Sequence, residues 1–190
     1  PTAEAETSIT RGTWTDGVYY NATAGFNFTP PENWLLADDE YIAQLVGVSK
    51  EMLGTEGEDL SDHEVVYDTF VQNPDNGTNV FIIYQKVSML GALGMGIGDI
   101  MDEIVKQMGE NTAMNCTYVG TTEQTLGSTD YQCAEFDVDI SGMTIKQYIL
   151  VNKFMNYTTN ITITAMASEP IEEFLPMFTS AQTAMADCCG

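Results

Sequence analysis

Positive charge is what this chain has least of. Lys and Arg together number 6, against 28 Asp and Glu, and the formal net charge at pH 7 is −22. A surface of this sign repels the phosphate backbone of nucleic acids and disfavours docking on anionic lipid. The composition therefore argues against nucleic acid as a partner. It is compatible with a cation, a basic partner or a surface that only keeps the protein soluble.

The chain also lacks an apolar run long enough to span a membrane and a recognisable signal peptide. It begins at Pro1, and we expect that a leader or N-terminal lipid anchor preceded it. Few lysines, many threonines and asparagines, and 4 cysteines are more typical of an exported protein than of a cytosolic one. These features predict an extracellular or cell-surface protein without a transmembrane span in this chain.

Catalytic motifs are missing as well. His63 is the only histidine, and although Asp62 and Glu64 flank it, no Gly-x-Ser-x-Gly nucleophile turn accompanies it. The adjacent pair Cys188 and Cys189 does not have the spacing of a zinc site. We therefore predict that the protein is not an enzyme and has no catalytic residues. A metal-assisted or acid-residue hydrolase with His63 as general base is the weakest alternative.

What is present fits one αβ domain. With 190 residues and 44% hydrophobic residues, the chain can build a single core. Residues 1–12 are polar and aperiodic, which predicts a linker or N-terminal arm, followed by one domain over residues 13–190. Alternation, turn residues and helical periodicity predict strands at 18–21, 26–29, 64–71, 79–88, 116–126, 130–140, 144–152 and 157–165, and helices at 37–46, at 99–108 and from residue 168 onward.

The strand at 130–140 has the clearest pattern. Its apolar residues alternate strictly with acidic ones, so one face should be buried and the other exposed. The buried set is expected to be Ala134, Phe136, Val138 and Ile140, and the outward set Glu135, Asp137 and Asp139.

The stretch from Val18 to Trp34 supports a resemblance. A short strand is followed by Gly25-Phe26-x-Phe28-x-Pro30-Pro31, then by Trp34 as an apolar anchor and an acidic helix start. From Tyr19 to about Leu45 this resembles the opening of PsbP/Mog1-like domains, in particular those of uncharacterised secreted or lipid-anchored proteins of Gram-positive bacteria.

The resemblance implies an α+β fold, a PsbP/Mog1-like α/β/α sandwich with an antiparallel six- to seven-stranded sheet and helices packed on its faces. It also implies a location at the surface of a Gram-positive cell. It does not imply any one activity, because the fold serves several unrelated roles.

One acidic loop is a candidate metal site. Two glycines and a run of carboxylates lie between residues 54 and 64, and calcium prefers many oxygen ligands from a flexible loop. The EF-hand pattern is absent, and a solvated acidic loop is the simpler interpretation. The candidate ligands are Glu56, Glu58, Asp59, Asp62 and Glu64.

Three functional hypotheses follow. The first is a non-enzymatic extracytoplasmic module, tethered at the cell surface, that binds an unidentified protein or small-molecule ligand. The second is a calcium-dependent version that uses the acidic loop, with calcium as its only cofactor. The third is the hydrolase with His63.

The cysteines give one further expectation. A tight turn at Gly127-Ser128 pairs Cys133 with Thr122 and leaves Cys116 six residues further along its strand. That separation is about 20 Å, well beyond the reach of a disulfide. We therefore expect Cys116 or Cys133 to bond to Cys188 or Cys189 in the tail.

Overall fold

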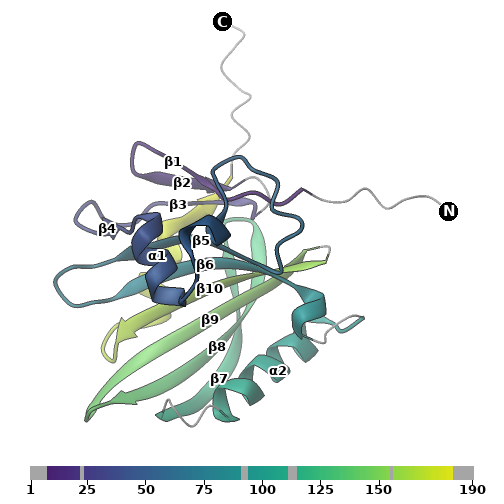
Figure 1. Ribbon diagram of the computed structural model, residues 1–190. Helices are drawn as coiled ribbons and strands as arrows, with labels where there is room; N and C mark the ends of the chain where they lie inside the picture. Colours follow the sequence, from purple (N-terminus) through teal and green to yellow (C-terminus); the bar gives the residue numbers. More distant parts are fainter. Residues whose placement is uncertain (1–7, 22–23, 91–93, 111–114, 155, 182–190) are drawn as a thin grey trace, which may run out of the picture.

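Two antiparallel sheets form most of the molecule. The structure is a computed structural model that describes residues 8–21, 24–90, 94–110, 115–154 and 156–181. The larger sheet has the strand order β4-β5-β6-β10-β9-β8-β7 and the smaller one the order β1-β2-β3-β11 (Figure 1). All strand pairs in both sheets are antiparallel.

The elements have the following bounds. The larger sheet contains β4 (Leu35–Leu36), β5 (Val65–Gln72), β6 (Asn79–Lys86), β7 (Asn115–Leu126), β8 (Thr129–Ile140), β9 (Met143–Phe154) and β10 (Tyr157–Met166). The smaller sheet contains β1 (Thr13–Thr15), β2 (Val18–Asn21), β3 (Phe26–Phe28) and β11 (Phe178–Ser180). The helices are α1 (Asp39–Val46) and α2 (Ile97–Glu110), with 3₁₀ turns η1 (Lys50–Leu53), η2 (Val87–Leu90), η3 (Ile171–Glu173) and η4 (Leu175–Met177).

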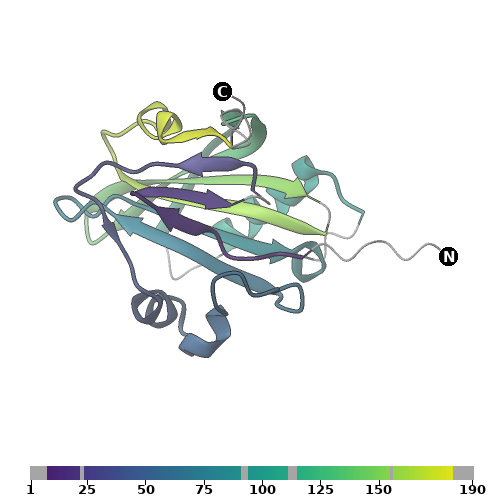
Figure 2. The same cartoon turned by 90° about the horizontal axis from the view of Figure 1, so that it is seen from above.

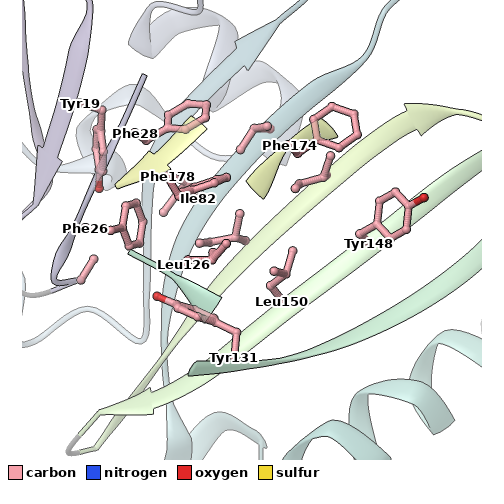
Figure 3. Close-up of a cluster of buried hydrophobic side chains, with 14 of the residues drawn as sticks. Tyr19, Phe26, Phe28, Ile82, Leu126, Tyr131, Tyr148, Leu150, Phe174 and Phe178 are labelled. Atoms are coloured by element: carbon pink, nitrogen blue, oxygen red, sulfur yellow. The ribbon is translucent and has the colours of Figure 1, made fainter. Parts of the chain in front are cut away.

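The main core lies between the two sheets. Apolar side chains of β2, β3 and β11 face those of β6 to β10 in one buried cluster (Figure 3), and Figure 2 looks down on the purple strands β1 to β3 over the larger sheet. Each fully buried aromatic ring in such a core contributes about 1.5–3 kcal/mol relative to exposure. The labelled members of this cluster are Tyr19, Phe26, Phe28, Ile82, Leu126, Tyr131, Tyr148, Leu150, Phe174 and Phe178.

The opposite face of the larger sheet is covered by the helices. α2 packs on β7, β8 and β9, and its residues Ile100 and Met101 are buried in one cluster with Phe136 and Val151. α1 packs near β5, where Ile42 lies in a small cluster with Phe70. The predicted α+β class and antiparallel seven-stranded sheet are thus confirmed. The helices lie on one face, and the smaller sheet occupies the other.

The register of β8 agrees with the alternation in its sequence. Ala134, Phe136 and Val138 are buried under α2, as predicted. Ile140 belongs to the same face but is 50% exposed, because it ends the strand next to the Ser141–Gly142 turn. The prediction for that residue is wrong, because α2 does not cover the last residue of β8.

Part of the expected N-terminal linker belongs to the domain. Ile9 is fully buried in the main core, and its carbonyl accepts a hydrogen bond from the Leu60 backbone N–H at 2.8 Å. Arg11 also contacts the domain. Residues 8–12 are therefore packed against it, whereas residues 1–7 lie outside the described residues.

Helix α1 buries only part of its apolar surface. Asp38 caps the helix by accepting from the Tyr41 backbone N–H at 2.8 Å, and Gly47 ends it at a φ of 73°. Ile42 is buried, but Tyr41 and Leu45 are 45% and 50% exposed. The helix has only 8 residues, and Ile42 and Ala43 are its buried residues.

The predicted C-terminal helix does not form. Pro170 and Pro176 restrict the backbone, and the segment makes the 3₁₀ turns η3 and η4 before entering strand β11. Phe178 pairs with Phe28 in β3 and stacks on its ring at 4.8 Å. The apolar side chains of this segment belong to the main core: Phe174 and Phe178 are buried, and Leu175 is packed against the same cluster.

The cysteine geometry is confirmed where it is described. Cys133 lies opposite Thr122, and both Cys116 and Cys133 are free thiols. They lie on opposite faces of the larger sheet, since Cys133 belongs to the main core and Cys116 packs toward α2. Burial raises the pKa of the Cys133 thiol to about 12. Cys188 and Cys189 lie outside the described residues, so the tail disulfide stays a prediction, which peptide mapping without reduction decides.

Trp34, the expected apolar anchor, is half-buried and packs against the main core. No helix among the described residues is long and apolar enough to cross a membrane.

Phe178→Ala tests the assignment of the C-terminal segment to the core. Loss of a ring that contacts Phe26 and Phe28 should lower the free energy of unfolding by about 3–5 kcal/mol. Thr179→Ala, at the next and exposed position, should change it by less than about 0.5 kcal/mol in the same urea titration. Equal effects of the two substitutions would contradict the strand assignment.

Candidate functional site

The acidic loop that sequence reasoning singled out uses some of its carboxylates locally. Glu58 accepts from the backbone N–H of Thr55 at 2.8 Å and from its hydroxyl at 2.9 Å. Asp59 accepts from the backbone N–H of Ser61 at 3.0 Å. These bonds lower the pKa of both exposed carboxyl groups, with the backbone N–H as the larger cause in each case.

The remaining candidates do not form a cluster with them. Glu56, Asp62 and Glu64 are exposed along the same loop. Across the described parts of the chain, no group of three or more His, Cys, Asp or Glu is arranged to hold a metal ion. Calcium binding stays a prediction, which a comparison of melting temperature with and without calcium decides.

His63 ends this loop, and its described hydrogen bonds use the backbone. Its N–H donates to the Leu60 carbonyl at 2.9 Å, and its own carbonyl accepts from the Tyr157 hydroxyl at 3.4 Å. The hydrolase hypothesis is not tested by this arrangement.

A buried carboxylate that sequence reasoning missed lies between the two sheets. Asp68 is in β5, and its side chain is 1% exposed. The Gly12 backbone N–H donates to its two oxygens at 2.9 and 3.1 Å, Asn21 Nδ2 donates at 3.3 Å, and the Tyr19 hydroxyl also donates. Tyr84 lies 2.9 Å from the Tyr19 oxygen and extends the network into β6.

Arg11 connects this network to the surface. Its guanidinium donates to the Asp68 carbonyl at 2.9 Å, to Asp39 at 2.8 Å and to the Gly54 carbonyl at 3.3 Å. Its Nε lies 4.0 Å from the Asp68 carboxylate. A buried charge is tolerated only when paired and hydrogen-bonded, and Arg11 and the donors supply both conditions.

The electrostatics of the network follow from its burial. Burial raises the pKa of Asp68, against the opposing effects of the Tyr19 and Gly12 donors and of Arg11. Burial, and next the Asp68 charge, raise the pKa of the Tyr19 and Tyr84 hydroxyls far above their ordinary value. The Asp68 carboxylate is buried and accepts from several donors of the same domain, so we assign the network a structural role. A single Asp inside an otherwise apolar strand was the signal in the sequence.

The two edges of the larger sheet are treated differently by the fold. At the β5 edge, β4 pairs with Val71 and Gln72, the Phe70 carbonyl accepts from Ala37 N at 2.9 Å, and Arg11 takes the Asp68 carbonyl. At the other edge, the 12-residue strand β7 pairs only with β8 within the described residues (Figure 1).

Among the described residues, no strand pairs with the outer edge of β7, although this edge has some protection. An unpaired edge presents a row of backbone N–H and C=O groups to any extended chain. Most of its side chains are exposed, including Tyr118 at 46% and Val119 at 52%. A bulge between Tyr118 and Gly120 interrupts its register with β8, which limits indiscriminate pairing.

A row of carboxylates runs beside this edge. Glu135, Asp137 and Asp139 extend from the face of β8 that is turned away from α2. Lys146 of β9 pairs with Glu135 and lies 3.6 Å from Asp137. These carboxylates therefore lie on the sheet beside a strand edge that no described strand pairs with.

Comparison with known proteins defines the fold. No family model and no curated protein matches the sequence. Among solved structures, the chain is similar to cyanobacterial PsbP (CyanoP) from Synechocystis sp. PCC 6803, with 11% identity, a TM-score of 0.50, and coverage of 94% of this chain and 97% of that one. A crystal structure from Bacteroides thetaiotaomicron VPI-5482 covers 87% of this chain and 48% of its own, with 13% identity and a TM-score of 0.45.

The chain therefore has a PsbP-like fold, as the opening stretch of its sequence predicted. At this level of identity the likeness concerns the fold alone, and function must be argued from the surface of this chain.

Asp68→Asn tests the buried network. The asparagine side chain has an N–H₂ group in place of one of the two carboxylate oxygens of Asp68. In either orientation of the amide, some of the groups that donate to Asp68 lose their acceptor. The free energy of unfolding should fall by about 1–3 kcal/mol. Asp75→Asn, in an exposed turn, is the matched control and should have no measurable effect.

The same pair of proteins predicts a pH dependence. Because burial raises the pKa of Asp68, the folded state binds this proton more tightly than the unfolded state does. That contribution is complete at low pH and is lost as pH rises through the folded pKa. The stability of wild type relative to Asp68→Asn should therefore increase as pH falls from about 7 to about 4. A constant difference across urea titrations in this range would contradict it.

Proposed function

We propose that the chain is a non-enzymatic extracytoplasmic module, tethered at the cell surface, that binds a partner protein along the open edge of β7. The observation that supports it most is the contrast between the two edges of the larger sheet. The β5 edge is closed by β4, by the start of α1 and by Arg11, whereas β7 offers 12 residues of edge. Strand addition to such an edge is a common mode of peptide recognition.

The surface around β7 is better suited to binding a partner protein than to catalysis. Tyr118 presents a half-exposed ring that packs on Phe136 at 5.6 Å, and such rigid aromatic residues are common anchors in interfaces. The buried titratable groups, Asp68 with Tyr19 and Tyr84, are engaged with one another and enclosed.

The compartment is argued from composition. Few lysines, four cysteines and a net charge of −22 suit an exported protein, and a segment preceding Pro1 would supply the tether. The envelope of a Gram-positive cell is the location that the resemblance of residues 19–45 implies.

Photo-crosslinking in the cells that produce the protein tests this proposal. Benzoylphenylalanine at Tyr118 should yield an adduct with one partner, because that side chain lies on the open edge. Tyr41 is the matched control, since it is a tyrosine of equal exposure, 45% against 46%, beside the opposite edge. If the protein lies at the cell surface, protease added to intact cells should digest the crosslinked protein.

Two proline variants confirm the edge. Neighbouring residues of a strand point their N–H groups to opposite sides, so one of Thr121→Pro and Thr122→Pro breaks the pairing with β8 and the other blocks only the edge. The variant that keeps wild-type stability should lose the adduct. Adducts from Tyr41 alone, none from Tyr118, or adducts that persist in that variant would overturn the proposal.

A further inference from the structure

The structure assigns a chemistry to the segment that binds this edge. We infer that it is a basic extended strand, whose lysine or arginine side chains reach across β7 to the carboxylates of β8. The inference rests on the proposed function and adds to it the class of partner.

The register places small residues between the edge and the carboxylates. Asp137 lies opposite Thr117, and Glu135 lies opposite Gly120. Asp139 lies opposite Asn115 at the start of the strand. Nothing lies within 4 Å of the position that a Cβ at Gly120 would occupy, so the space above this part of β7 is open.

The distances suit long cationic side chains. Strands in a sheet are about 4.8 Å apart, so a strand added beyond β7 would lie about 10 Å from β8. A short side chain cannot cross that gap, whereas an extended lysine or arginine approaches a carboxylate that extends toward it. The small residues Thr117 and Gly120 leave the path free.

The charge of the row is only partly compensated. Among the described ion pairs, Lys146 is the cation of this row, contacting Glu135 and Asp137, while Asp139 accepts from the Thr144 hydroxyl at 2.8 Å. The Glu135 side chain is 29% exposed to solvent and the Asp137 side chain 43% exposed. Both carboxylates are therefore accessible to a second cation. Lysine and arginine on a partner complete the compensation.

The opposite face of β7, on the α2 side of the sheet, indicates which residues should alternate with the basic ones in the partner strand. Tyr118 lies opposite Phe136, on the α2 side of the sheet, and is half-exposed there. Because successive side chains of a strand point to opposite faces, the partner should alternate basic residues with apolar or aromatic ones.

Charge also decides between a partner and a second copy. Each copy has a net charge of −22, and pairing of two β7 strands would place two rows of carboxylates in one continuous sheet. Like charges brought together in this way oppose association, whereas a basic strand is attracted.

The probe is an acetylated and amidated peptide, Thr-Lys-Val-Lys-Val-Lys-Thr, compared with the same peptide carrying Gln in place of Lys. Binding to the full chain is followed by amide chemical shifts in two-dimensional NMR at low salt. The Lys peptide should bind about 3- to 30-fold more tightly than the Gln peptide, as a few exposed ion pairs allow. The shifts should concentrate on β7 and decrease with added salt.

The double variant Glu135→Gln with Asp137→Asn should remove most of that preference. The matched control, Glu56→Gln with Asp62→Asn, removes the same charge from the exposed acidic loop beside the opposite edge and should keep it. This comparison separates the carboxylate row from the attraction of the whole molecule for cations.

The outcomes distinguish this inference from the proposed function. Equal binding of both peptides at β7, lost in the edge-blocking proline variant, would overturn the basic strand and leave the edge as the binding site. No binding of the Lys peptide at millimolar concentration, or shifts outside β7, would overturn the inference, while the crosslinking result decides the function. A dimer that the proline variant disrupts would assign the edge to a second copy.

Discussion

The fold depends on the buried contact between two sheets, and one carboxylate is part of that contact. Asp68 is buried in β5, and the groups that neutralise and solvate it come from the chain between residues 11 and 21. A buried charge without such partners would cost several kcal/mol. The position of the smaller sheet over the larger one is therefore coupled to a specific set of donors as well as to apolar burial. Gly12 is required there, because a Cβ would overlap the Tyr19 ring.

The same contact explains why the two edges of the larger sheet differ. The segment that brings donors to Asp68 also brings Arg11 to the outer carbonyl of β5, and the chain leaving β3 supplies β4 and α1. The groups that cover that edge thus come from residues 11–39, which precede β5 in the chain (Figure 1). β7 lies at the far end of the sheet. Within the described residues α2 packs against one of its faces and β11 contacts it near Gly127, while no other strand pairs with its outer edge.

Strands with strong alternation could be predicted from the sequence. The pattern of β8 defined its buried face, and the Gly127–Ser128 turn fixed the pairing of Cys133 with Thr122. Local signals failed where tertiary contacts decided the structure. The last segment has apolar residues at helical spacing, but Pro170 and Pro176 limit it to 3₁₀ turns, and pairing with β3 draws Phe178 into a strand.

The candidate site was even less visible in the sequence. The acidic loop was a candidate metal site because its carboxylates are close together in the sequence. Among the described residues, however, they are not arranged around a common position where a metal ion could bind. The carboxylates of β8 lie opposite small residues of β7, namely Thr117 and Gly120. This arrangement depends on the register between the two strands, which the sequence alone does not give. Asp68 was missed because nothing in one sequence says which residues of a distant segment will surround it.

The attachment of residues 8–12 has a mechanical consequence. A pulling force applied at the N-terminus enters the domain at Ile9 and Arg11, before any strand bears load. To extend the chain it must first draw an apolar side chain from the core and detach a guanidinium from three oxygen acceptors at once. A domain held by its N-terminus would therefore resist tension at this joint, and the sheets and the β7 edge would keep their shape under load.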